Sequence, residues 1–155
     1  MKNLILCLFL LSGSFLLAQT NPEKEFQEKI ENFFQEVFSE LDSTRLEKYV
    51  TKDFVLFEDG EIYNNDSVKI MIKNLIHQFS SEENKGKKLE RINSFEFLGA
   101  DSNQSSGWIY YRNFAEFKMD GTKIAQLHWL ESANFIRTDE GWKIAFLHST
   151  LVKEK

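Results

Sequence analysis

The stretch from Gln104 to Val152 constrains the fold of this chain more than any other part of the sequence. Two turn signals, Asp120-Gly121 and Asp139-Glu140-Gly141, divide a run of aromatic and β-branched residues there. Residues of these types favour strands, and a two-residue Asp-Gly loop favours a tight type I′ hairpin. The stretch therefore predicts three long strands joined by short turns. Their bounds are about 104–118, 122–137 and 142–152.

The earlier part of the chain predicts helices. Apolar residues recur at intervals of three and four in two segments, about 22–41 and 65–79, which is the period of an amphipathic helix. Asn21-Pro22 and Asn64 are capping signals that begin such helices. Asp42-Ser43-Thr44 ends the first helix and caps a short second one.

Short strands are predicted between and after these helices. Phe54–Glu58 and Glu61–Tyr63 flank an Asp-Gly turn, and a further strand is expected at about 89–98. The charged segment Ser80–Lys88 before it has no periodicity, which indicates a solvated loop rather than a basic binding patch. Helices followed by a long-stranded antiparallel sheet are typical of the α+β class.

Composition limits the domain count and the partners. With 155 residues, of which 42% are hydrophobic, the chain can bury one substantial core and is too short for two ordinary domains. Its formal net charge of −5 argues against nucleic acid or an anionic membrane as a partner.

The first eighteen residues have the pattern of a secretory signal peptide. A short basic start precedes the apolar run Leu4–Leu17, and Ala18-Gln19 is a plausible cleavage point. An uncleaved membrane anchor is the alternative, but the run is shorter than the roughly 20 residues that a spanning helix needs. Cys7, the only cysteine, lies inside this segment, so the exported chain would have no disulfide. We expect residues 1–18 to be a signal peptide, residues 19–155 to form one domain, and the protein to be periplasmic or secreted.

Loose motifs between about Glu23 and Val152 carry a resemblance to a known fold family. They are the long first helix, the short helix that ends at Tyr49, Asp53-Phe54, the third helix, Gly141-Trp142-Lys143-Ile144 and His148-Ser149-Thr150. Together they resemble the nuclear transport factor 2-like superfamily, most closely its SnoaL-like and kinase association-domain-like branches. The resemblance implies a cone-shaped α+β fold, in which three N-terminal helices pack on a curved, mainly antiparallel mixed sheet that wraps a pocket. It implies no single activity, because the fold hosts isomerases, cyclases, dehydratases, hydrolases and proteins without a known reaction.

Pairs counted back from the Asp120-Gly121 turn predict which side chains share a face of the central hairpin. Met119 pairs with Thr122, and by extension Arg112 pairs with Trp129 and Tyr110 with Glu131. The predicted inner face therefore carries Trp108, Tyr110, Arg112 and Phe114 opposite Ala133, Glu131, Trp129 and Leu127. In the next hairpin Arg137 would pair with Trp142, which places Glu131 opposite His148. A shift of one residue would turn His148 outward.

Glu131 is the main candidate for chemistry in this predicted pocket. Aromatic neighbours would raise its pKa by desolvation, whereas Arg112 would lower it. If burial dominates, Glu131 could be a general base or acid with His148 as its partner, and Tyr110 would donate a hydrogen bond to a developing oxyanion. If Arg112 dominates, the two residues form a structural ion pair that only shapes the cavity.

The remaining ionisable residues are weaker candidates. Asp53 lies where the resemblance implies a pocket acid, but an acid before a strand is as often a turn residue. His77 on the third helix and His128 on the presumed outer face have no close partner of metal-binding type, so we expect no metal site. No glycine motif for a phosphate-bearing cofactor and no serine-nucleophile motif occurs, and we expect no cofactor.

Two functions are compatible with these residues. The first is a non-catalytic pocket protein that binds a small, partly apolar or anionic molecule, with Arg112 as the anchor for a carboxylate. Its ligand would lie among Trp108, Tyr110, Arg112, Trp129 and His148. The second is a cofactor-free isomerase, dehydratase or cyclase, in which Glu131 and His148, with Asp53, move a proton on a carbonyl compound.

Assembly is a separate expectation that is compatible with both functions. The other face of the sheet is predicted to be a mixed surface suited to a second subunit. Its expected contact residues are Ile109, Tyr111, Leu130 and Leu147, and they predict a homodimer with a two-fold interface.

Overall fold

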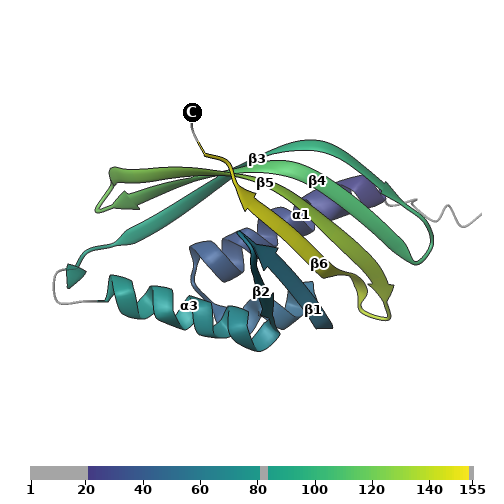
Figure 1. Cartoon of the computed structure of the whole chain (residues 1–155), viewed down its shortest axis with the longest axis horizontal. Coiled ribbons are helices and arrows are strands. Elements are labelled where there is room, and N and C mark those ends of the chain that lie inside the picture. Colours follow the sequence, from purple (N-terminus) through teal and green to yellow (C-terminus); the bar gives the residue numbers. More distant parts are fainter. Residues whose placement is uncertain (1–20, 81–83, 154–155) are drawn as a thin grey trace, which may run out of the picture.

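The computed structural model describes residues 21–80 and 84–153, in which a curved sheet covers a layer of helices (Figure 1). The helices are α1 (Pro22–Phe33), α2 (Leu46–Tyr49) and α3 (Asn65–Phe79), with a π-helical segment η1 (Phe34–Ser39) and a 3₁₀ turn η2 (Ser43–Arg45) between α1 and α2. The strands are β1 (Val50–Glu58), β2 (Glu61–Asn64), β3 (Leu89–Ser102), β4 (Ser106–Met119), β5 (Thr122–Thr138) and β6 (Gly141–Leu151). The predicted signal peptide lies outside the described residues.

Local capping explains where the long helices begin. The side chain of Asn21 accepts a hydrogen bond from the backbone N–H of Glu23 (3.1 Å), and Pro22 occupies the first helical position. Asn64 and Ser67 form a reciprocal capping box at the start of α3. The predicted first helix of about twenty residues is present, but its last third is π-helical. Phe34, Val37 and Phe38 of this segment are buried in the core.

The six strands form one mixed sheet in the order β2-β1-β6-β5-β4-β3. All neighbouring pairs are antiparallel except β1 and β6, which are parallel. The predicted α+β class with a mainly antiparallel sheet is therefore confirmed. One detail differs, because β1 and β2 precede α3 and only α1 and α2 come before the sheet begins.

The register of the central hairpin differs from the predicted one. Met119 pairs with Thr122 as expected, but Ile124 has no partner, and Phe117 pairs with Ala125. Such a β-bulge adds one residue to one strand, and every later side chain of that strand then faces a different partner. Glu131 consequently lies opposite Tyr111 and not opposite Tyr110.

This bulge reverses the predicted faces of β4. The predicted inner residues Trp108, Tyr110, Arg112 and Phe114 lie on the outer face, whereas Ile109, Tyr111, Asn113 and Ala115 are buried on the inner face. On β5, Trp129, Glu131 and Ala133 do face inward as predicted. Since Ile109, Tyr111 and Leu147 are buried inside, only Leu130 of the four expected interface residues lies exposed on the outer face. The homodimer itself stays a prediction.

A second irregularity turns His148 outward. Arg137 pairs with Trp142 as predicted, but Phe135 pairs with Ile144 and Asn134 with Phe146, which leaves Ala145 without a partner. The shift places Ser149 opposite Glu131, and His148 lies exposed on the outer face. The predicted pairing of Glu131 with His148 is therefore wrong by one residue.

The core lies between α1 and the inner face of the sheet. The ring of Phe26 stacks on Phe135 with centroids 4.3 Å apart and meets the edge of Trp142 at 5.2 Å. Gly107 permits this approach, because a Cβ at that position would overlap the Phe26 ring. Of the described helices, none is long and apolar enough to cross a membrane.

Candidate binding site

Glu131 is the centre of a polar cluster on the inner face of the sheet. Its side chain is buried, and its carboxyl group accepts hydrogen bonds from Oγ of Ser149 on β6 (2.9 Å) and Nδ2 of Asn113 on β4 (3.3 Å). Burial raises the pKa of Glu131 to about 7, and the hydrogen bond from Ser149 opposes this rise most strongly. Both protonation states of Glu131 are therefore accessible near neutral pH.

Tyr111 on β4 lies beside the same carboxyl group. Its hydroxyl makes no hydrogen bond of normal geometry with a described residue, yet it is near enough to lower the pKa of Glu131. Burial, followed by the charge of Glu131, raises the pKa of Tyr111 well above its ordinary value. Tyr111 is thus a neutral hydroxyl group available to this cluster.

Arg91 on β3 brings a positive charge to the same interior. Its guanidinium lies 5.5–5.6 Å from the ring centroids of Phe34, Phe38, Phe117 and Trp129. Its Nε donates a hydrogen bond to Oδ1 of Asn93 (3.0 Å). Burial lowers the pKa of Arg91 to about 10, so the side chain stays charged at neutral pH.

Glu58 on β1 is the second carboxyl group of the site. Burial and the neighbouring Asp59 raise its pKa, whereas Arg91 lowers it. The charges of Glu58 and Glu131 both favour the protonated form of Arg91. Within the described residues, Arg91 contacts Asn93 and four aromatic rings, and it makes no ion pair within 4 Å with either carboxylate.

A cavity of about 30 Å³ adjoins these groups. Its lining residues are Phe34, Phe38, Leu56, Glu58, Arg91, Trp129, Glu131, Leu147 and Ser149. A space of this size holds about two water molecules and is far smaller than the usual small-molecule pocket. Phe34 and Phe38, which narrow it, belong to the π-helical segment η1, a form of helix that is frequent at functional sites.

The structure brings only some of the predicted site residues together. Glu131 and Trp129 line the cavity, but Arg112 lies outside and pairs with Glu96 at 2.7 Å. Trp108 and Tyr110 stack on each other on the outer face (5.4 Å). Their predicted place in the pocket is wrong because of the bulge at Ile124.

The other predicted acid–base residues also lie away from the cavity. Asp53 is exposed on β1, beside a different surface hollow near α3. His148 is exposed and lies 3.4 Å from Oγ1 of Thr150. His77 is exposed on α3, and His128 stacks on Phe114 at 4.3 Å on the outer face.

Sequence reasoning missed several members of the site. Tyr111, Asn113 and Ser149 were assigned to the wrong face or given no role because the two bulges leave no clear mark in the sequence. Arg91 did leave a signal. It begins the alternation Arg91, Asn93, Phe95 and Phe97, whose members are all less exposed than the residues between them.

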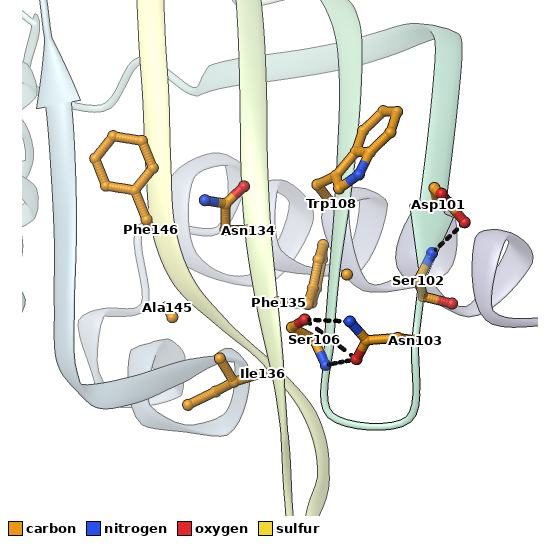
Figure 2. Close-up of a pocket in the computed structure, with 11 residues that line it drawn as sticks. Asp101, Ser102, Asn103, Ser106, Trp108, Asn134, Phe135, Ile136, Ala145 and Phe146 are labelled. Atoms are coloured by element: carbon orange, nitrogen blue, oxygen red, sulfur yellow. Dashed lines mark hydrogen bonds between the residues drawn. The ribbon is translucent and has the colours of Figure 1, made fainter.

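A larger hollow of about 460 Å³ lies on the outer face and is a weaker candidate (Figure 2). Trp108, Asn134 and Phe146 lie along it on three neighbouring strands. Asp101 is the single ionisable residue among those that line it. The side chain of Asn103 is used within its own turn, by hydrogen bonds with Ser106. Within residues 21–80 and 84–153, no three acidic, histidine or cysteine side chains are placed to hold a metal ion.

The fold is shared with solved structures of very different sequence. A ketosteroid isomerase-like protein from Erwinia carotovora atroseptica is 12% identical, with a TM-score of 0.62 over 86% of this chain and 99% of that one. A nuclear transport factor 2-like protein with a cystatin-like fold from Novosphingobium aromaticivorans is 13% identical, with a TM-score of 0.65 over 86% of each chain. A hexachlorocyclohexane dehydrochlorinase is 11% identical, with a TM-score of 0.65 over 85% of this chain and 86% of that one.

These likenesses confirm the expected fold. The chain has the nuclear transport factor 2-like, or cystatin-like, architecture. No protein-family model matches the sequence, and no curated protein matches it. At identities of this level the likeness establishes the fold alone, because one fold hosts many activities.

Proposed function

We propose that the protein binds a small organic molecule inside the cone, at the cavity beside Glu131. One observation carries the proposal: polar side chains from β4 and β6 converge on the buried carboxyl group of Glu131 on β5, in an otherwise largely apolar interior. Burial of a charged or polar group is costly unless it is paired and hydrogen-bonded. Apolar walls with a few convergent polar groups are typical of ligand sites.

Binding requires the cavity to enlarge. Its volume of about 30 Å³ cannot hold a molecule of ordinary ligand size. We expect Phe34 and Phe38 to be the walls that move, because both lie on η1 and not on the hydrogen-bonded sheet. We therefore expect the bound form to differ from the free form in the rotamers of these two rings.

The experiment is a fragment screen by amide NMR on residues 19–155. Fragments that bind should shift the amide signals of Asn113, Glu131 and Ser149. Ser149→Leu should abolish these shifts by filling the cavity, whereas Ser132→Leu on the outer side of β5 should not. Fragment shifts confined to the outer hollow, at Trp108 and Asn134, would overturn the proposal even if Ser149→Leu failed to fold.

Proton transfer by Glu131 is a second candidate function. The observation in its favour is the pKa of about 7, which suits a general base or acid near neutral pH. Two proteins of similar fold are described as ketosteroid isomerase-like and as a dehydrochlorinase. In this second function Tyr111, and not Tyr110, would donate the hydrogen bond to a developing oxyanion. His148 and Asp53 would take no part, because both lie away from the cavity. Glu131→Gln should then retain ligand binding and abolish turnover, because the amide cannot accept the proton.

Export is proposed as well, on the pattern of residues 1–18. The full chain expressed in an exporting bacterial host should yield a product that begins at Gln19. An intact mass that still includes Met1–Ala18 would contradict cleavage.

A further inference from the structure

We propose that the ligand of this cavity is a monocarboxylic acid with an apolar body, and that its carboxylate binds Arg91. The inference rests on the proposed small-molecule site and names the class of molecule that fits it. It also predicts that binding is coupled to protonation of Glu131.

Arg91 has hydrogen-bond donors that no described residue accepts. A guanidinium group has five N–H donors, and among the described residues only Nε has a protein acceptor, the Oδ1 of Asn93. The four surrounding rings hold the group in place without satisfying its terminal nitrogens. Those nitrogens form a planar fork that matches the two oxygens of a carboxylate.

Asn93 orients Arg91. Asn93 accepts from Nε of Arg91 and donates through Nδ2 to Oγ of Ser39 (2.8 Å), the last residue of η1. The same asparagine therefore connects the arginine to the helical segment that carries Phe34 and Phe38. A ligand that engages Arg91 is placed directly against these two rings.

Several ionisable groups surround the cavity. The titratable groups that face Glu131 are Arg91 on β3, Tyr111 on β4 and, across the cavity, Glu58 on β1. The adjacent strand β6 contributes the neutral Ser149, and η1 contributes only rings. Burial raises the pKa of both glutamates, and Arg91 stays charged at neutral pH. One carboxylate balances the charge of Arg91, and an ionised glutamate would repel a dianion more strongly than a monocarboxylate.

The cavity limits the size of the ligand and the polarity of its body. The existing space accommodates a carboxylate group but little more. The rest of the ligand must displace or stack on Phe34 and Phe38, which favours an aromatic or aliphatic body. A hydrophilic body would lose its hydration there without gaining hydrogen bonds.

The test uses calorimetric titration of residues 19–155 with matched acids and alcohols. The probes are benzoate, phenylacetate and octanoate, with benzyl alcohol, phenethyl alcohol and octanol as neutral controls. At pH 6 we expect at least one acid to bind tenfold or more tightly than its alcohol. Its affinity should fall about tenfold by pH 8, because ionised Glu131 repels the carboxylate. Titrations in buffers of different ionisation enthalpy near pH 7 should show uptake of a proton.

Two matched arginine variants show which arginine binds the carboxylate. Arg91→Met should abolish the advantage of the acid over the alcohol, while Arg112→Met, which removes the outer arginine, should leave it unchanged. Glu131→Gln should make the affinity for the acid independent of pH between 6 and 8.

The outcomes separate the two proposals. Alcohols that bind as tightly as acids, with signals shifted at Ser149, would overturn the carboxylate assignment and leave the small-molecule site standing. Acid binding that is lost in Arg112→Met and retained in Arg91→Met would place the anion on the outer face and overturn the inference. Failure of every acid and alcohol to bind would count against both proposals.

Discussion

Two arginines on neighbouring strands have opposite environments. Arg112 on β4 lies on the outer face, 45% exposed, and its Nη1 is 2.7 Å from Oε2 of Glu96. Arg91 on β3 lies on the inner face among four aromatic rings, without an ion pair to a described residue. The Arg112–Glu96 pair is a solvated surface contact. Arg91 is held between the rings, and its terminal N–H groups have no acceptor among the described residues. The face of the sheet, and not the residue type, therefore decides the environment of each arginine.

The difference between the two faces extends to apolar residues. We expect substitutions of these residues to cause the largest changes in the free energy of unfolding. Ile109 is fully buried on the inner face of β4, and Ile136 is 41% exposed on the outer face of β5. Ile109→Ala should lower the free energy of unfolding by about 2–5 kcal/mol, because it removes packed methyl groups and leaves a cavity. Ile136→Ala should change it by less than about 1 kcal/mol. Urea denaturation of both variants measures the contrast, and equal losses would contradict the assignment of faces.

The pH dependence of stability reports the environment of Glu131. Its pKa is raised from 4.5 to about 7 in the folded protein, so the folded state binds more protons than the unfolded state between these values. Stability should therefore fall as pH rises from 4.5 to 7, by up to about 3 kcal/mol for this group.

Glu131→Gln isolates this contribution, because the variant cannot titrate at that position. The difference in unfolding free energy between wild type and Glu131→Gln should change across this pH range and level off above it. Glu96→Gln on the outer face is the control, because it removes a carboxyl group that lies outside the cavity. A difference that did not vary with pH would mean that folding does not raise the pKa of Glu131.

Arg91→Met sharpens the comparison of the two arginines. The charge of Arg91 lowers the pKa of Glu131, so its removal should move the titration of Glu131 to higher pH. Because methionine refills the space among the rings, the stability at pH 5 should change by only about 1 kcal/mol. Arg112→Met should not move the titration, and carboxyl carbon NMR shifts of Glu131 would follow both variants. An unchanged titration in Arg91→Met would contradict the proximity of the two side chains.

The smallest effect is expected for the outer ion pair. Arg112→Ala should cost about 0.2–1 kcal/mol, since both partners are exposed and the interaction is screened by salt. The difference from wild type should vanish in about 1 M sodium chloride. A cost that persists in high salt would show that Arg112 contributes by packing and not by charge.

The candidate site could be predicted only in part, for a reason visible in particular residues. Trp129 and Glu131 were placed correctly because alternation along one strand is a local property. Their partners on β4 were not, because the pairing depends on Ile124, which looks like any other strand residue. Arg91 alternates with apolar and amide residues and could have been found. Its position beside Glu131 could not, since β3 and β5 are separated in the sheet by β4.

By itself, the sequence determined the identity and approximate bounds of the helices and strands, the sites of the tight turns and the fold they resemble. These features depend on capping, periodicity and turn residues that act over a few positions. Only the tertiary structure decided which face each side chain of β4 and β6 occupies, and so which arginine lies beside the buried glutamate. A single bulged residue inverts every later position of a strand relative to its partner, and the sequence around Ile124 and Ala145 does not show that a bulge forms there.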